Sequence, residues 1–143
     1  MVFANVLVAY DGSDLSKKAL TYALNLVTDN PSARLHVVHV YQFPAFVIGE
    51  ALIPAPASYD KEYYEQAEKL MDGARDTVAS HPNTNIVLKQ GQPAFDLLDY
   101  AGEQSCDLIV MGSRGLGGIR EFVLGSVSHN VVQHSKVPVL VIK

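Results

Sequence analysis

Glycines and a serine near the end of the chain have the types and spacing of a phosphate-binding site. Residues 108–111 form an apolar run typical of a buried parallel strand. The glycines that follow are Gly112, Gly115, Gly117 and Gly118. Without a Cβ, such residues let successive backbone N–H groups turn toward one point, where an anion would bind. Gly125 and Ser126 then open a predicted helix, whose positive dipole end attracts negative oxygens.

The same residues allow a simpler interpretation. Glycines can form a long loop without binding anything, and serine is a common helix N-cap. Ser126 would then either cap the helix or donate its hydroxyl to a phosphate. Arg114 lies within the loop and Arg120 near it, where each guanidinium would either contact phosphate oxygens or be solvated. The glycines alone leave the choice between a loop and an anion site open.

An acidic residue stands at the end of the first predicted strand. Residues 3–10 are apolar and β-branched enough for a central strand, and Asp11 follows them. Asp11 has three interpretations: a turn residue, a ligand of a ribose or metal ion, and a phospho-acceptor. The third is weakened because Val8, Ala9 and Tyr10 precede it, where a receiver domain would have an acidic pair. Beside a phosphate-binding loop, the carboxylate would order a nucleotide and its divalent cation.

Other kinds of site find little support in the residue spacing. No lysine stands in a Gly-x4-Gly-Lys-Ser/Thr pattern and no Gly-x-Gly-x-x-Gly follows the first strand, which argues against P-loop and dinucleotide sites. His36 and His39 face opposite sides of a strand, and His129 and His134 are poorly spaced for sharing one metal ion. No base is indicated for Ser126, so we predict no catalytic residue.

The elements that must position these residues alternate between strand and helix. The predicted strands cover residues 3–10, 35–41, 85–90, 107–111 and 137–142. The predicted helices cover residues 14–28 and 58–80, a segment from Pro93 to the stop at Gly102, and a segment from Ser126. This alternation predicts an α/β fold: a single-domain open five-stranded parallel sheet, with right-handed crossovers and helices on both faces. With strand order 3-2-1-4-5, Asp11 and Gly112 emerge together at the switch point, where ligands bind.

A long segment separates the second strand from the following helix. Residues 42–57 contain three prolines and many apolar residues, so we predict a loop. This loop either packs over neighbouring helices, or forms a lid or a surface for a partner.

The composition excludes several classes of protein. The 143 residues, 48% hydrophobic and 18% charged, fit one globular domain over residues 1–143, with no membrane-spanning stretch. A net charge of −4 argues against a nucleic-acid surface. The lone Cys106 cannot form an internal disulfide, and no basic region precedes the apolar N-terminus. We therefore expect a cytoplasmic protein.

The spacing Gly112-x2-Gly115-x9-Gly125-Ser126 resembles the nucleotide-binding signature of the universal stress protein family, in its ATP-binding branch. The resemblance covers almost the whole chain. It includes Asp11 after the first strand, His39-Val40 at the end of the second, Gly91-x-Pro93, and a final Val-Pro-Val-Leu-Val-Ile. It implies an adenine nucleotide alpha hydrolase-like fold.

The resemblance also implies a set of ligand-binding residues. Ala9, Tyr10 and Asp11 would line the adenine and ribose, and the backbone of Val40 would meet the adenine. The residues that would hold the ribose and phosphates are Met111, Gly112, Gly115, Gly125, Ser126, Val127 and Ser128. Arg114 joins this candidate set through its position in the loop and not through the resemblance. The ligand would be ATP, or AMP or ADP, with Mg²⁺ or Mn²⁺ near Asp11 through water. Tyr10 departs from the family pattern, in which this site is often smaller or proline, and its ring is expected to alter how the base sits.

The resemblance further implies a homodimer that acts in the stress response. The last strand, which begins at Val137 and ends at Ile142, would pair with its twin across a two-fold axis, and this pairing would cover an apolar edge that otherwise invites association. We expect a regulatory nucleotide binder whose output is binding rather than turnover. One alternative is a slow ATPase or phosphotransfer enzyme, which ranks second because no residue is positioned as a general base. The other is a nucleotide-free interaction module that uses residues 42–57.

Overall fold

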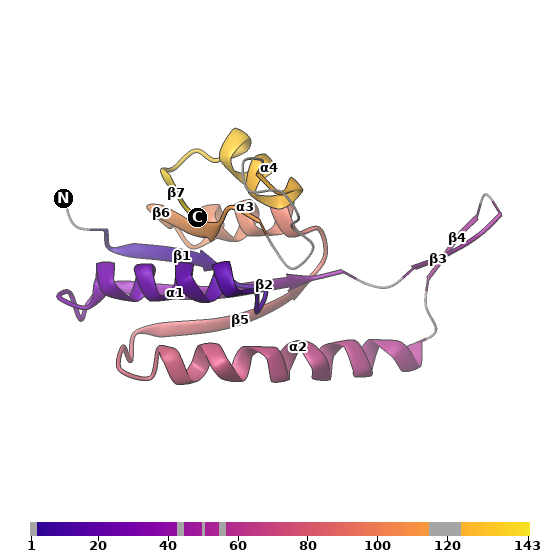
Figure 1. The fold of residues 1–143 in the computed structure, drawn as a ribbon, viewed down its shortest axis with the longest axis horizontal. Helices are drawn as coiled ribbons and strands as arrows, with labels where there is room; N and C mark the ends of the chain where they lie inside the picture. The colour runs from indigo at the N-terminus through magenta and orange to yellow at the C-terminus, as the bar shows by residue number, and fades with distance from the viewer. Residues whose placement is uncertain (1–2, 43–44, 50, 55–56, 115–123) are drawn as a thin grey trace.

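The computed structural model describes residues 3–42, 45–49, 51–54, 57–114 and 124–143 (Figure 1). The elements in these residues are, in order, β1 (Asn5–Ala9), α1 (Asp14–Val27), β2 (Arg34–Tyr41), β3 (Ala45–Ile48), β4 (Ala51–Pro54), α2 (Ala57–Thr77), β5 (Thr84–Gln90), α3 (Pro93–Glu103), β6 (Leu108–Gly112), α4 (Ser126–His134) and β7 (Val139–Ile142). α2 is 21 residues long but carries many charges, and none of the described helices has the apolar length needed to cross a membrane.

Five strands form a parallel sheet in the order β5-β2-β1-β6-β7. This is the predicted order 3-2-1-4-5, and the predicted fold class is confirmed. Val6 of β1 pairs with Leu35 of β2 on one side and with Leu108 of β6 on the other. The chain therefore leaves β1 in one direction and returns past it to β6, which places the switch point between these two strands.

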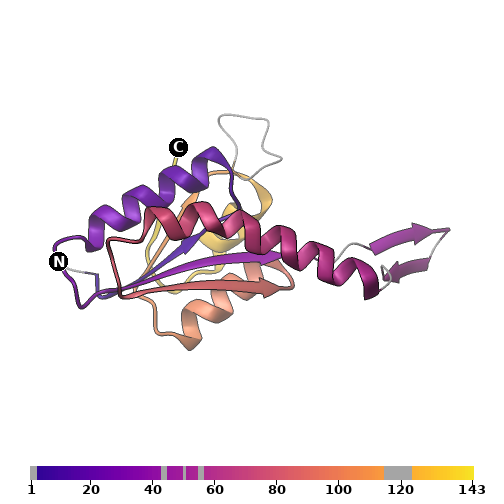
Figure 2. The same ribbon diagram turned by 90° about the horizontal axis from the view of Figure 1, so that it is seen from below.

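Helices cover both faces of this sheet (Figure 2). α1 and α2 pack on one face, where Leu20, Val27 and Met71 join a core cluster with alternate residues of the strands. α3 and α4 pack on the other face, where Leu97 and Val131 join a second cluster. Because successive strand residues point to opposite faces, the near-continuous apolar strands supply both clusters at once.

Helix ends follow the sequence signals closely. The Ser13 side chain caps α1 by accepting a hydrogen bond from the Ser16 N–H at 3.2 Å, and Pro93 stands at the start of α3, where its missing N–H costs nothing. Four predicted ends differ by one to three residues. α1 ends at Val27 rather than at residue 28, α2 runs from Ala57 to Thr77 rather than from 58 to 80, and α3 continues past Gly102 to Glu103.

The last strand is shorter than predicted. β7 begins at Val139, two residues after the predicted start at Val137. The Pro138 carbonyl still accepts a hydrogen bond from the Ile109 N–H at 3.0 Å. Since proline has no N–H to donate, the regular ladder begins only after it. Like β5 on the other side, β7 lies at an edge of the sheet, as expected.

The prediction of a loop over residues 42–57 was wrong. β3 and β4 form an antiparallel hairpin, with Val47 opposite Leu52, and Gly49 lies in the turn with a φ of 64° that favours glycine. Two short apolar runs separated by two residues that include glycine are a hairpin signal, which the prolines obscured. Both views show the hairpin beyond the N-terminal end of α2 and away from the sheet, so β3 and β4 do not pack over the helices (Figures 1 and 2).

Candidate functional site

A cavity of about 430 Å³ opens at the switch point, where β1 and β6 end. All the predicted site residues line it except Gly115, which lies outside the described residues together with Gly117, Gly118 and Arg120. The lining set therefore includes Ala9, Tyr10, Asp11, Val40, Met111, Gly112, Arg114, Gly125, Ser126, Val127 and Ser128. Segments more than 80 residues apart in the sequence meet here because β1 and β6 are paired.

Five further residues line this cavity that the sequence did not single out as site residues. They are Ser16, Val38, His39, Pro93 and Leu97. Two signals were available: His39 directly precedes Val40 at the end of β2, and Pro93 begins the helix after β5. Ser16 and Leu97 carried no such signal, since each enters the cavity only through the packing of its helix.

The end of β2 presents an unpaired peptide edge to the cavity. Tyr10 N–H donates to Val38 O at 2.9 Å, which shows that the polar backbone groups of Val38 point toward β1. Backbone direction alternates along a strand, so the N–H and C=O of Val40 point the same way. β1 ends at Ala9, opposite Val38, and within the described chain Val40 has no strand partner on that side. One donor and one acceptor thus face the cavity side by side.

Three helices begin at this cavity. Ser16 in the first turn of α1, Pro93 at the start of α3 and Ser126 at the start of α4 all line it. The first N–H groups of a helix lack intrahelical partners and carry a partial positive charge. Arg114 is the one cationic side chain among the described lining residues that is charged at neutral pH. The cavity is therefore suited to an anion, although Asp11 contributes one negative charge.

Hydrogen bonds hold the start of α4 against the end of β6. Gly125 N–H donates to Ser113 O at 2.8 Å, and the buried Ser128 hydroxyl donates to the same carbonyl at 2.6 Å. Gly125 is consequently the N-cap and Ser126 the first helical residue, so the alternative in which Ser126 caps this helix was wrong. The Ser128 hydroxyl serves this structural contact, whereas the exposed Ser126 lies at the open side of the cavity.

Gly112 is required by close packing as well as by any ligand. A Cβ placed on Gly112 would lie 2.8 Å from the Cβ of Leu15 in α1, closer than real side chains approach. The glycine at the end of β6 therefore allows α1 to begin beside the cavity. Part of the glycine signature is thus explained by the fold itself.

Asp11 has a structural role in the turn before α1. One of its carboxylate oxygens accepts a hydrogen bond from Ser13 N–H at 2.9 Å, and its own N–H donates to Ser16 Oγ at 3.3 Å. The first of its three interpretations, a turn residue, therefore describes what the structure shows. Asp11 also lines the cavity, so its interpretation as a ribose or metal ligand stays a prediction.

His39 and Tyr10, two neighbours of Asp11, are both affected by burial. His39 Nδ1 donates to Tyr10 O at 2.8 Å, and burial lowers the pKa of His39, although this hydrogen bond and the Asp11 charge oppose the shift. His39 is therefore neutral at pH 7. The ring of Tyr10 packs in the core cluster on the α1 and α2 face with Met71 and Ala74, and the effect of this residue on a bound base stays a prediction.

The described residues contain no group of three or more His, Cys, Asp or Glu side chains arranged to bind a metal ion. A Mg²⁺ ion that accompanies a nucleotide is usually held by one or two carboxylates together with phosphates and water. The single carboxylate of Asp11 fits that kind of site.

Comparison with known proteins agrees with this architecture. The family model of the universal stress protein family matches residues 3–143. Universal stress protein YxiE of Bacillus subtilis is 34% identical over 149 residues, covering 99% of this chain and all of that protein. The structure of universal stress protein UspA from Lactobacillus plantarum aligns with a TM-score of 0.80 at 27% identity, over 100% of this chain and 99% of that one.

A further solved structure is described as a universal stress protein in complex with cAMP. It is 28% identical, with a TM-score of 0.68, over 100% of this chain and 98% of that chain. The whole of the present chain is thus covered by the family, in both sequence and fold. The protein belongs to the universal stress protein family.

Proposed function

We propose that the cavity at the switch point binds an adenine nucleotide, with ATP as the expected ligand. The observation that carries this proposal is the unpaired edge of Val40, which offers an N–H beside a C=O at the end of β2. Adenine presents an acceptor, N1, beside a donor, the N6 amino group, on its Watson–Crick edge. Guanine presents the opposite pattern, so this edge favours adenine.

The opposite side of the cavity suits the phosphates. The α4 N-terminus and Arg114 supply positive charge beside Gly112 and Gly125, which line the same part of the cavity. Asp11 lies between the two sides and would hold the ribose, or Mg²⁺ or Mn²⁺ through water. A bound divalent ion would neutralise phosphate charge that otherwise opposes the Asp11 carboxylate.

A relative supports the ligand class. The universal stress protein in complex with cAMP, 28% identical to this chain, binds an adenine nucleotide. AMP and ADP are therefore expected to bind here as well, and titration with each nucleotide ranks their affinities.

Binding rather than turnover is the proposed output. Asp11 already has a structural hydrogen bond, since one of its oxygens accepts from Ser13 N–H. His39 donates from Nδ1 to Tyr10 O, which leaves Nε2 with the acceptor lone pair, so His39 is the base to test in the alternative in which ATP is slowly hydrolysed. We further propose that the protein is a cytoplasmic homodimer paired through β7, which lies at an edge of the sheet with Leu140 exposed.

Calorimetric titration tests the nucleotide proposal. We expect ATP to bind and GTP to bind at least about tenfold more weakly, because its base mismatches the Val40 edge. Arg114→Ala should weaken ATP binding by roughly tenfold, since it removes a charge-assisted hydrogen bond. Lys136→Ala, an exposed cation outside the cavity, is the matched control and should bind ATP as the wild type does. A folded protein with no affinity for ATP, ADP or AMP would refute the proposal.

A phosphate-release assay separates binding from slow hydrolysis. We expect release at background in the presence of ATP and Mg²⁺. Steady release that is abolished in Asp11→Ala would instead favour the enzyme.

A further inference from the structure

A second cavity of about 440 Å³ lies on the α1 and α2 face of the sheet. It is bounded by the turn after β1 and by one side of α2, and we call it the α2 cavity. Tyr10 and Asp11 line both cavities, so the end of β1 separates the two. In this turn Gly12 approaches α2 closely, since a Cβ placed there would lie 3.0 Å from Leu70.

The α2 cavity contains the hydroxyl of a buried tyrosine. Tyr10 is only 4% exposed, and its hydroxyl lies 3.6 Å from the position of a Cβ on Gly73, a residue of the cavity wall. Among the described residues, this hydroxyl has no hydrogen-bond partner. Every fully buried side-chain N or O atom in the same part of the chain does have one, so the Tyr10 hydroxyl oxygen is not fully buried. The Tyr10 hydroxyl must therefore open into the cavity, where it is available to a ligand.

The hydroxyl is a donor at neutral pH. Burial raises the pKa of Tyr10, and the negative charge of Asp11 raises it further. The phenol consequently keeps its proton and has a hydrogen bond to give.

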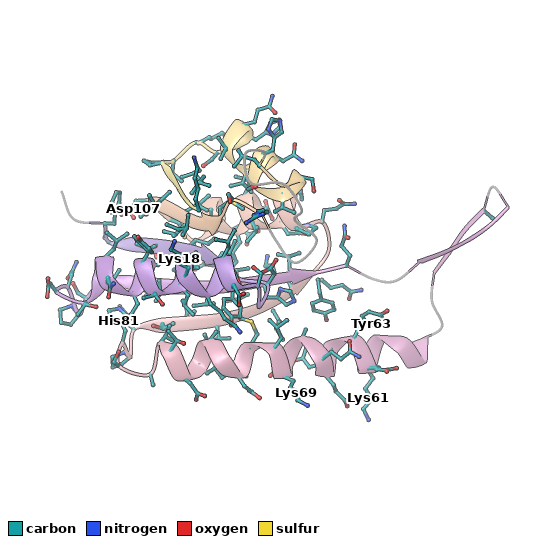
Figure 3. The ribbon with its side chains drawn as sticks, viewed as in Figure 1. Lys18, Lys61, Tyr63, Lys69, His81 and Asp107 are labelled. Carbon is teal, nitrogen blue, oxygen red and sulfur yellow. The ribbon has the colours of Figure 1, made fainter. Side chains whose placement is uncertain are left out.

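The other polar groups of the cavity are also mostly donors. Lys17 of α1 and Lys69 of α2 carry ammonium groups, and Gln66 carries an amide. Lys69 lines the cavity from α2, and Figure 3 shows its side chain directed away from the sheet, so its ammonium group reaches the mouth of the cavity only when the long flexible stem turns back. Among the described residues of this wall, Asp11 is the one acidic residue. An anion would therefore sit away from Asp11, toward Gln66 and the lysines.

We propose that the α2 cavity is a second binding site, for a phosphoryl group held by the Tyr10 hydroxyl, Gln66, Lys17 and Lys69. The dianionic phosphoryl group matches two ammonium groups and two neutral donors. This site does not rest on the nucleotide proposal, because its residues other than Tyr10 and Asp11 lie outside the first cavity. The phosphoryl group belongs either to a free small anion or to the end of a nucleotide that reaches past Asp11.

Titration with inorganic phosphate, in nucleotide-free protein and a phosphate-free buffer, tests the site. We expect saturable binding that Lys17→Met with Lys69→Met weakens by more than about tenfold. Tyr10→Phe should weaken it by roughly tenfold while leaving the fold intact, because the hydroxyl has no partner in the protein. Lys61→Met is the matched control, since Lys61 is an exposed lysine on α2 that does not line the cavity.

AMP and ATP titrations of the double lysine variant identify the source of the phosphoryl group. If ATP binds more weakly and AMP does not, the group is the end of the nucleotide. If only inorganic phosphate is affected, the group is a free anion. AMP affinity by itself tests the nucleotide proposal, so the two proposals can fail separately. The second site is overturned by two results together: the wild-type protein does not bind phosphate at tens of millimolar, and the ratio of ATP to AMP affinity is unchanged in the double variant. Equal phosphate binding by wild type and double variant overturns it too.

Discussion

Replacing Gly112 by alanine tests how closely α1 and β6 are fitted at the cavity of the switch point. The added Cβ would lie 2.8 Å from Leu15 Cβ, and 3.3 Å from both the Leu15 carbonyl carbon and the Arg114 carbonyl oxygen. These neighbours belong to the backbone or stand next to it, so they cannot rotate away as the end of a long side chain can. Either α1 shifts or the end of β6 does.

The cost of Gly112→Ala can be placed on the scale of overpacked cores. Inserting a methyl group into a well-packed site costs about 1–3 kcal/mol. For a chain of 143 residues, each kcal/mol corresponds to about 3 °C in melting temperature. We therefore expect a melting temperature lower by roughly 3–9 °C, measured by calorimetry or circular dichroism, and urea unfolding should give the same ranking.

Gly102→Ala is the matched control for this experiment. Gly102 lies in the last turn of α3, and a Cβ there would meet nothing within 4 Å. Alanine should stabilise this helix position by up to about 1 kcal/mol. The two substitutions make the same chemical change with opposite expected signs. If Gly112→Ala proves as stable as the wild type, the inferred fit between α1 and β6 is incorrect.

Three further predictions address other parts of the molecule. Burial lowers the pKa of His36, whose ring forms hydrogen bonds with Asn5 Oδ1 at 2.6 Å and the Tyr100 hydroxyl at 2.8 Å. Below pH about 6.5 the unfolded chain therefore binds more protons than the folded one, and the free energy of unfolding should fall from pH 7 to pH 5. The fall should be less steep in His36→Gln, and a flat wild-type profile would contradict this reasoning. Leu140→Lys places a charge on the exposed edge of β7 and should convert the proposed dimer into a monomer in analytical ultracentrifugation; a monomeric wild type at the same concentration would exclude that dimer. Burial, with the Asp107 charge second, raises the pKa of Cys106 to about 11, so a thiol reagent at pH 8 should label it only after unfolding, and rapid labelling of the native protein would show the thiol to be accessible.

The sheet could be predicted because its signals are local. Each apolar run is bounded by a turn residue, and alternation with helices leaves few topologies once crossovers are right-handed. The strand order then brought Asp11 and Gly112 to one edge, which the structure confirms. The hairpin at residues 45–54 was missed because prolines on both sides of it outweighed the glycine-containing turn between two apolar runs.

Residue types and spacing alone were enough to indicate the family, the strand order and the position of the cavity. The strand order and the position of the cavity follow from apolar runs with the periods of strand and helix, and the family follows from the resemblance of the glycine spacing. All three can be read without knowing which segments touch. Only the tertiary structure decided that the Tyr10 ring turns toward α2, that Ser16 and Leu97 enter the cavity at the switch point, and that Gly112 is also needed to admit α1. The direction of a side chain depends on register and packing between segments far apart in the sequence, and no local pattern records those contacts.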